Sequence, residues 1–157
     1  MHVDPDNPVV ALCAAGMAVD GDREQARALF MRAWSIHRDD YEASIAAHFL
    51  ARHQPTGEET LAWNERALRH ATMVTDGRTT EFLASLYLNV GDSYLAAHRP
   101  DDATAAARLA RTHLAALPAG GYRDFVEYGI RRLEDRILSA RGDVDLTREQ
   151  ATSRPRT

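Results

Sequence analysis

Apolar residues recur at spacings of three and four along most of the chain, and runs of alternating β-branched residues are absent. Spacings of three and four are typical of amphipathic helices, whereas strict alternation is typical of half-buried strands. The pattern therefore predicts an all-α protein with about seven helices. A chain of 157 residues is long enough to bury one core, so we expect a single helical domain.

Capping residues, prolines and glycines delimit the predicted helices. Asn7 and Pro8 open the first helix, and Thr56 and Glu59 have the spacing of a capping box, in which each residue satisfies the other's free amide. The expected ranges are about 8–19, a stretch that begins after Gly21, 39 or 40 to just before His53, 56–73, 80–98, 100–117 and 122–141.

The last predicted helix differs on its two sides. Arginines lie on one side, and an apolar stripe at helical spacing lies on the other, made of Phe125, Val126, Gly129, Ile130, Leu133 and Ile137. The apolar signal ends at Gly142. We therefore expect a helical domain over residues 1–141 and a frayed or disordered tail over residues 142–157.

A small–large–small pattern repeats in the second helix of each predicted pair. It is clear in Ala26, Phe30 and Ala33, and shifts of 34 and then 43 residues bring it to two further sets: Thr60, Asn64, Ala67 and Ala103, Ala107, Ala110. The segment from Tyr87 to Tyr94 carries a matching first-helix pattern, with Gly91 at its small position. Such periodicity predicts stacked helix pairs, each of which needs its neighbours to bury its apolar face.

These patterns resemble the tetratricopeptide repeat (TPR) family, over about residues 8–140. The third pair matches well and the second is degenerate, with His48 where glycine or alanine is usual. In the first pair, Ala14 takes the small position and Met17 a large one. The resemblance implies three repeats and a C-terminal capping helix in a right-handed superhelix of antiparallel helix pairs.

The resemblance also implies a concave groove lined by the first helix of each pair, which binds a peptide or a protein surface. In the first pair the implied groove positions are Pro8, Ala11, Ala15, Ala18 and Val19. In the second and third pairs the implied binding residues are Glu42, Ile45, Phe49, Arg52, His53, Leu88, Asn89 and Asp92. The lysine and asparagine positions of the chaperone-binding subfamily match only at Asn89, so that activity is not expected.

Composition argues against two kinds of partner, nucleic acids and membranes. The net charge of −4 gives no reason to expect nucleic acid, and no apolar run is long enough to span a membrane. All 19 basic residues are arginine, which we interpret as codon bias in a high-GC bacterial genome. The start of the chain is acidic and unlike a signal peptide, so we expect a cytoplasmic protein.

The sequence offers no convincing catalytic or metal site, so we expect neither an enzyme nor a cofactor. Cys13 is alone, and on the first helix it is expected to be a buried packing thiol. Gly91-Asp92-Ser93 is similar to the nucleophile block of one esterase family, but it falls within a helix with no strand before it. The histidines lack the i,i+3 or i,i+4 spacing of metal ligands on one helix.

Three hypotheses remain open at this point. The first is a protein-interaction scaffold that uses the groove. The second is a homo-oligomeric module that uses an apolar patch of Ala11, Ala15, Ile45, Phe49 and Leu88. The third is a small-molecule binder or enzyme with a pocket of Phe49, His53, Asn89 and Asp92.

Overall fold

The computed structural model describes residues 4, 6–19 and 21–152, and within 143–152 it describes the backbone alone. Over this part of the chain the protein is all-α, with seven helices and no strand, which confirms the predicted fold class. The helices are α1 (Pro8–Ala18), α2 (Arg23–Ile36), α3 (Asp40–Ala51), α4 (Gly57–Met73), α5 (Thr80–Ala96), α6 (Pro100–Leu114) and α7 (Gly121–Thr152).

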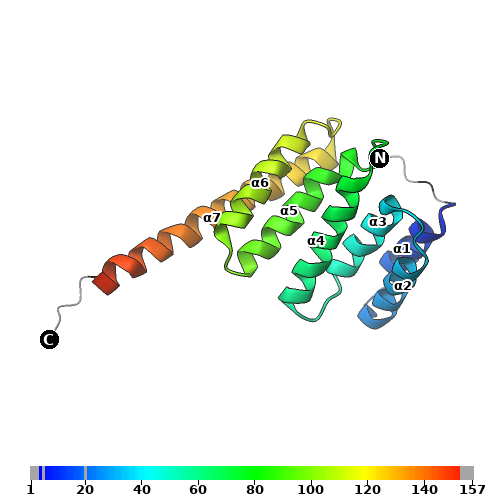
Figure 1. Cartoon of the computed structure of the whole chain (residues 1–157), viewed down its shortest axis with the longest axis horizontal. Coiled ribbons are helices and arrows are strands. Elements are labelled where there is room, and N and C mark those ends of the chain that lie inside the picture. Colours follow the sequence, from blue (N-terminus) through cyan, green and yellow to red (C-terminus); the bar gives the residue numbers. More distant parts are fainter. Residues whose placement is uncertain (1–3, 5, 20, 153–157) are drawn as a thin grey trace.

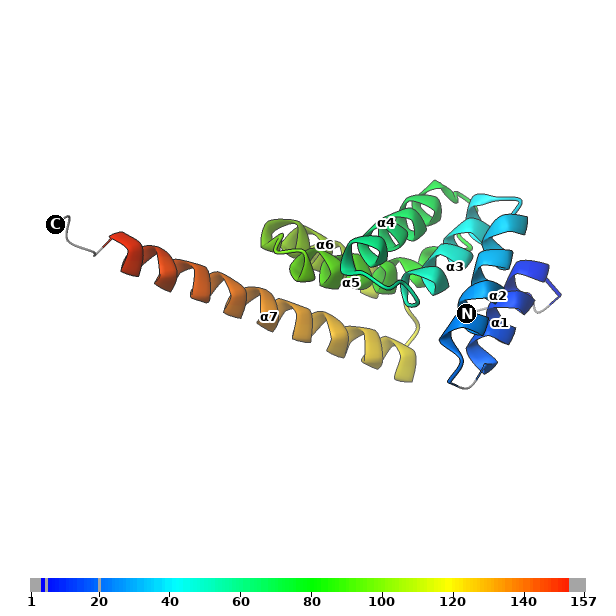
Figure 2. The ribbon, with the colours of Figure 1, turned by 90° about the horizontal axis from the view of Figure 1, so that it is seen from below.

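The first six helices form three antiparallel pairs that lie side by side (Figure 1). The longest helix, α7, packs against α5 and α6, and its C-terminal half extends beyond the rest of the molecule in both views (Figures 1 and 2). This succession of pairs is compatible with the superhelix that the repeats predict. None of the helices in the described ranges is long and apolar enough to cross a membrane.

Side-chain caps begin several helices where the sequence predicted them. The Asn7 side chain accepts hydrogen bonds from the backbone amides of Val9 and Val10 at the start of α1. At the start of α4, the Thr56 hydroxyl accepts from the Glu59 amide at 3.2 Å. The Glu59 carboxylate in turn accepts from the Thr56 hydroxyl rather than from its amide. Each cap satisfies amides that have no partner within the helix.

The repeated small and large residues form the core between the two helices of each pair. Phe30 and Ala33 of α2 and Ala103 and Ala110 of α6 are completely buried. In the first pair the close approach differs from the prediction. A Cβ atom on Gly16 would lie 2.5 Å from the Phe30 ring, so Gly16 rather than Ala14 is the small residue at the contact.

The apolar stripe of α7 is confirmed in part. Its buried members are Val126, Ile130, Leu133 and Ile137. Phe125 was assigned to the same stripe, but 71% of its surface is exposed. A single helix therefore carries a packed face and an exposed aromatic residue.

The described part of α7 is longer than the predicted helix. The helix was expected to stop near Arg141, yet its backbone stays helical to Thr152. Extending an existing helix adds one hydrogen bond for each residue that is fixed, so it can continue without an apolar face. Residues 153–157 of the expected tail lie outside the described residues.

Candidate functional site

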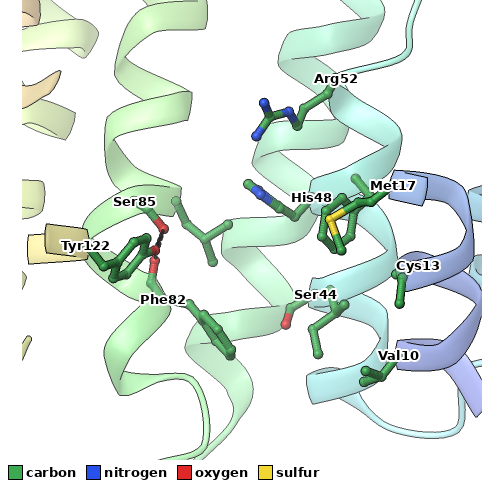
Figure 3. Close-up of a pocket in the computed structure, with 13 residues that line it drawn as sticks. Val10, Cys13, Met17, Ser44, His48, Arg52, Phe82, Ser85 and Tyr122 are labelled. Carbon is green, nitrogen blue, oxygen red and sulfur yellow. Dashed lines mark hydrogen bonds between the residues drawn. The ribbon is translucent and has the colours of Figure 1, made fainter. Parts of the chain in front are cut away.

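A cleft of about 430 Å³ opens between α1, α3 and α5 and is closed at one side by the first turn of α7 (Figure 3). Three of the four contributing helices are the first helices of the predicted pairs, which is where the groove was expected. The lining is formed by Val10, Cys13, Ala14, Met17, Ser44, Ile45, His48, Phe49, Arg52, Phe82, Ser85, Leu86 and Tyr122.

The cleft lies where the backbones of α3 and α5 approach each other less closely than those of α1 and α3 or of α5 and α7. Side chains of α3 and α5 still meet below it, where Ala47 and Leu86 belong to one buried cluster with residues of α4. His48 of α3 and Asn89 of α5 face each other across this junction, with 3.4 Å between the His48 Nδ1 and Asn89 Nδ2 atoms. At the repeat position equivalent to His48, α5 has Gly91. A bulky imidazole thus stands where close packing requires a small residue.

The walls of the cleft are mainly apolar. Phe49 is held by stacking on the buried Phe30, with ring centroids 5.3 Å apart and planes inclined by 14°. Met17 stands at the rim with 60% of its surface exposed. Figure 3 shows Met17 over α3 and Phe82 extending from α5 on the opposite side. The two walls therefore present side chains that would gain from contact with an apolar ligand.

Most polar groups of the lining already have partners within the chain. The Ser44 hydroxyl donates to the Tyr41 carbonyl at 2.8 Å. The Tyr122 hydroxyl donates to Ser85 Oγ at 3.0 Å, and Ser85 donates to the Phe82 carbonyl at 2.9 Å (Figure 3). Because these groups are satisfied, an apolar ligand could cover them without stranding a buried donor.

Burial shifts the pKa values of two lining residues, His48 and Cys13. Desolvation, with a smaller effect of the nearby Arg52 charge, lowers the pKa of His48 to about 4. This imidazole is therefore neutral at pH 7. Burial also raises the pKa of the Cys13 thiol to about 12, which suits a packing residue and not a nucleophile.

Three of the predicted groove residues line the cleft, namely Ile45, Phe49 and Arg52. Two more lie beside it. Asn89 faces His48 across the α3–α5 junction. His53 lies against the Phe30 ring, with 4.9 Å between ring centroids, and its Nδ1 atom is buried without a hydrogen-bond partner.

The other three predicted groove residues are engaged elsewhere in the chain. Glu42 is 3% exposed and accepts hydrogen bonds from Asn7 Nδ2 and from the Arg38 guanidinium, each at 2.8 Å. These bonds explain why the Glu42 pKa falls to about 2.

Leu88 and Asp92 both face α7. Leu88 is 8% exposed and belongs to the core formed with α7, and Asp92 Oδ1 accepts from Arg136 Nη1 at 2.6 Å. Glu42, Leu88 and Asp92 therefore do not line the cleft. Of the four residues predicted for a small-molecule pocket, Phe49 lines the cleft, whereas His53, Asn89 and Asp92 do not.

On α1 the lining is rotated relative to the prediction. The groove was expected along Pro8, Ala11, Ala15, Ala18 and Val19, but the cleft is lined by Val10, Cys13, Ala14 and Met17. The shift follows from Gly16, which turns toward Phe30 and fixes the rotation of the helix. Residues that the sequence reasoning missed include Val10, Met17, His48, Phe82 and Tyr122. The bulky His48 at a small-residue position was the available signal.

The described residues include no group of three or more His, Cys, Asp or Glu side chains arranged to hold a metal ion. Comparison with known proteins adds no assignment: no family model matches the chain, and no curated protein or solved structure matches it. The cleft is thus interpreted from its own geometry.

Proposed function

We propose that this protein is an interaction scaffold that binds an apolar segment of a partner protein in the cleft between α1, α3 and α5. The observation that carries the proposal is the open junction between α3 and α5, which leaves about 430 Å³ lined mainly by apolar side chains. Leaving such a surface in water is unfavourable, so a partner that covers it gains free energy.

A polypeptide suits this cleft better than a metabolite does. Sites for small polar molecules rely on a few converging polar groups that fix the ligand. Here the hydroxyl groups of Ser44, Ser85 and Tyr122 already donate hydrogen bonds to other groups of the chain. Apolar side chains of a bound segment would contact Met17 and Phe49 without needing those donors. The proposal assigns no chemical step to any residue.

The repeat pattern supports the same proposal. Three antiparallel pairs in which small and large residues alternate at the helix contacts are the arrangement that the TPR resemblance implies. In this proposal the odd-numbered helices line the binding face, as in that family. A cytoplasmic bacterial protein, as the sequence indicates, would meet its partner in that compartment.

The test compares two substitutions of exposed or half-exposed apolar residues. Phe49→Glu places a charge inside the cleft, whereas Met73→Glu places one at the end of α4, where Met73 is 63% exposed and does not line the cleft. Both variants would be used with wild type to probe an array of short peptides that carry Leu and Phe at varied spacings. We expect binding to wild type and Met73→Glu and a loss of about tenfold or more in Phe49→Glu.

The proposal fails if no peptide of the array binds, or if both variants bind like wild type. Circular dichroism of each variant before the assay separates a lost fold from a lost contact. Peptides selected in this way define a sequence preference, which can then be compared with candidate partners.

A second function, self-association, is favoured by a different surface. On α7 the side chains of Phe125, Tyr128 and Leu138 are 71%, 55% and 68% exposed, and none of them packs against α5 or α6. Exposed apolar groups on a projecting helix are typical of a partner surface. A second copy of the chain would cover them by pairing along α7.

Sedimentation velocity over a range of concentrations tests self-association. A dimer that is lost in Phe125→Ser but kept in Met73→Ser would support pairing through α7. A monomer at every concentration would rule it out for this chain on its own.

A further inference from the structure

Arg52 is the one charged side chain that lines the cleft. It lies at the C-terminal end of α3, and its guanidinium extends over one end of the cleft above His48 (Figure 3). No hydrogen bond or ion pair of its guanidinium is found within the described residues. Arginines at other helix contacts are neutralised, as in the pairs Arg111–Glu134 at 2.5 Å and Arg136–Asp92 at 2.6 Å.

The charge of Arg52 acts on the cleft itself. The lining contains no Asp or Glu, so no acid in the wall offsets it. Burial is the main cause of the lowered pKa values of His48 and His53; the Arg52 charge adds to it at His48, and the Arg23 and Arg52 charges add to it at His53. The two imidazoles stay neutral at pH 7 and do not compete for an anion. This end of the cleft is therefore locally positive in a chain whose net charge is −4.

We infer that the cleft selects partner segments in which an Asp or Glu side chain lies beside apolar residues, the carboxylate pairing with Arg52 while the apolar side chains contact Met17 and Phe49. This inference rests on the proposed function and specifies its partner. A guanidinium can bind a carboxylate through two parallel hydrogen bonds, which places the acid at a fixed position relative to the apolar contacts. Electrostatic complementarity of this kind contributes mainly to specificity.

The experiment uses three amidated versions of one cleft-binding peptide, which are identical except for Asp, Asn or Lys at a single position. That position is moved along the peptide to find the best register with Arg52. Fluorescence anisotropy then measures the affinities for wild type, Arg52→Gln and Arg52→Glu. Arg69→Gln is the matched control, because Arg69 is exposed on α4 and outside the cleft.

We expect wild type and Arg69→Gln to bind the Asp peptide about three- to tenfold more tightly than the Asn peptide, and the Lys peptide most weakly. Arg52→Gln is expected to bind the three peptides with similar affinity, and Arg52→Glu is expected to bind the Lys peptide most tightly and the Asp peptide most weakly. The preference should also weaken with added salt, because the Arg52 side chain is exposed.

Two failures are distinguishable. If the peptides bind in a Phe49-dependent way but without charge preference, the inference is wrong and the proposed function stands. If no peptide binds through the cleft, both are wrong. A further arm uses the Asn peptide with a free C-terminus. Tighter binding of that peptide than of the amidated Asp peptide would identify the chain terminus, and not an acidic side chain, as the source of the carboxylate, and would overturn the inference.

Discussion

Two neighbouring junctions between first helices of the pairs and the helix that follows differ in how closely they pack: α5 and α7 pack tightly, whereas α3 and α5 leave a cleft. Between α5 and α7, Leu88 fits where Gly129 has no side chain and Leu133 fits where Gly91 has none. Between α3 and α5, His48 occupies the position equivalent to Gly91, and the two backbones stay farther apart. The first junction is part of the core and the second is the cleft. The size of one repeated residue thus distinguishes the closed junction from the open cleft.

The largest expected effect is on the closed junction. Leu133 is 1% exposed, so Leu133→Ala should lower the free energy of unfolding by about 2–5 kcal/mol, because it leaves a cavity between α5 and α7. Met17→Ala is the matched change at the open junction, where 60% of the side chain is exposed. It should change the free energy of unfolding by less than about 0.5 kcal/mol. Urea titrations followed by circular dichroism measure both, and equal effects would contradict the distinction.

The second-largest expected effect on stability comes from adding a side chain at Gly91, where α5 and α7 approach closely. A Cβ on Gly91 would lie 2.6 Å from Leu133 Cδ2 and 3.4 Å from the Ala106 Cβ. Gly91→Val should therefore destabilise the protein by about 1–3 kcal/mol. The control is Gly142→Ala in the same α7 helix as Leu133, where a Cβ meets nothing within 4 Å. That change should stabilise by up to about 1 kcal/mol, since alanine is the better helix former. A tolerated Gly91→Val would mean that close approach is not required.

The open junction should be sensitive to pH through His48. Its folded pKa of about 4 lies below its ordinary value of 6.5, so between pH 7 and pH 5 the unfolded chain takes up a proton that the folded chain does not. Stability present above pH 6.5 is then lost as the pH falls, by up to about 2 kcal/mol at pH 5. His53, whose pKa is also lowered, acts in the same direction. The measurement is the difference in pH slope between wild type and His48→Gln, and identical slopes would contradict it.

The smallest expected effect concerns the surface pair Arg136–Asp92 beside the closed junction. Both side chains are about half exposed, at 51% and 45%, and exposed pairs contribute little. Arg136→Gln should therefore cost less than about 1 kcal/mol in urea titration. A larger loss would mean that charge, and not the fit of Leu88 and Leu133, holds α7 in place.

The fold was predictable because its signals are local. Each helix is marked by residues that lie close together in the sequence: a cap, such as Asn7 or Thr56, and an apolar residue at every third or fourth position after it. The end of α7 could not be predicted in this way, because the sequence of its last turns carries no apolar stripe that would mark a helix.

The site was predictable only in part, because it depends on how each helix is rotated about its axis. On the middle helix α3, the predicted residues Ile45, Phe49 and Arg52 line the cleft. The rotation of α1 is set by the contact of Gly16 with Phe30, and Leu88 is covered by α7. Both are contacts between different helices, so periodicity within a helix does not reveal them.

Our central proposal is that the cleft between α1, α3 and α5 is the binding surface. The methionine methyl groups test it directly, because Met17 lines the cleft while Met31 of α2 and Met73 of α4 do not. A protein labelled with ¹³C at these methyl groups would be titrated with the Asp peptide, with Met17→Leu used to assign the Met17 signal. The account predicts that the Met17 signal shifts and that those of Met31 and Met73 stay in place. A peptide that binds and moves Met31 or Met73 while Met17 stays unchanged would contradict it.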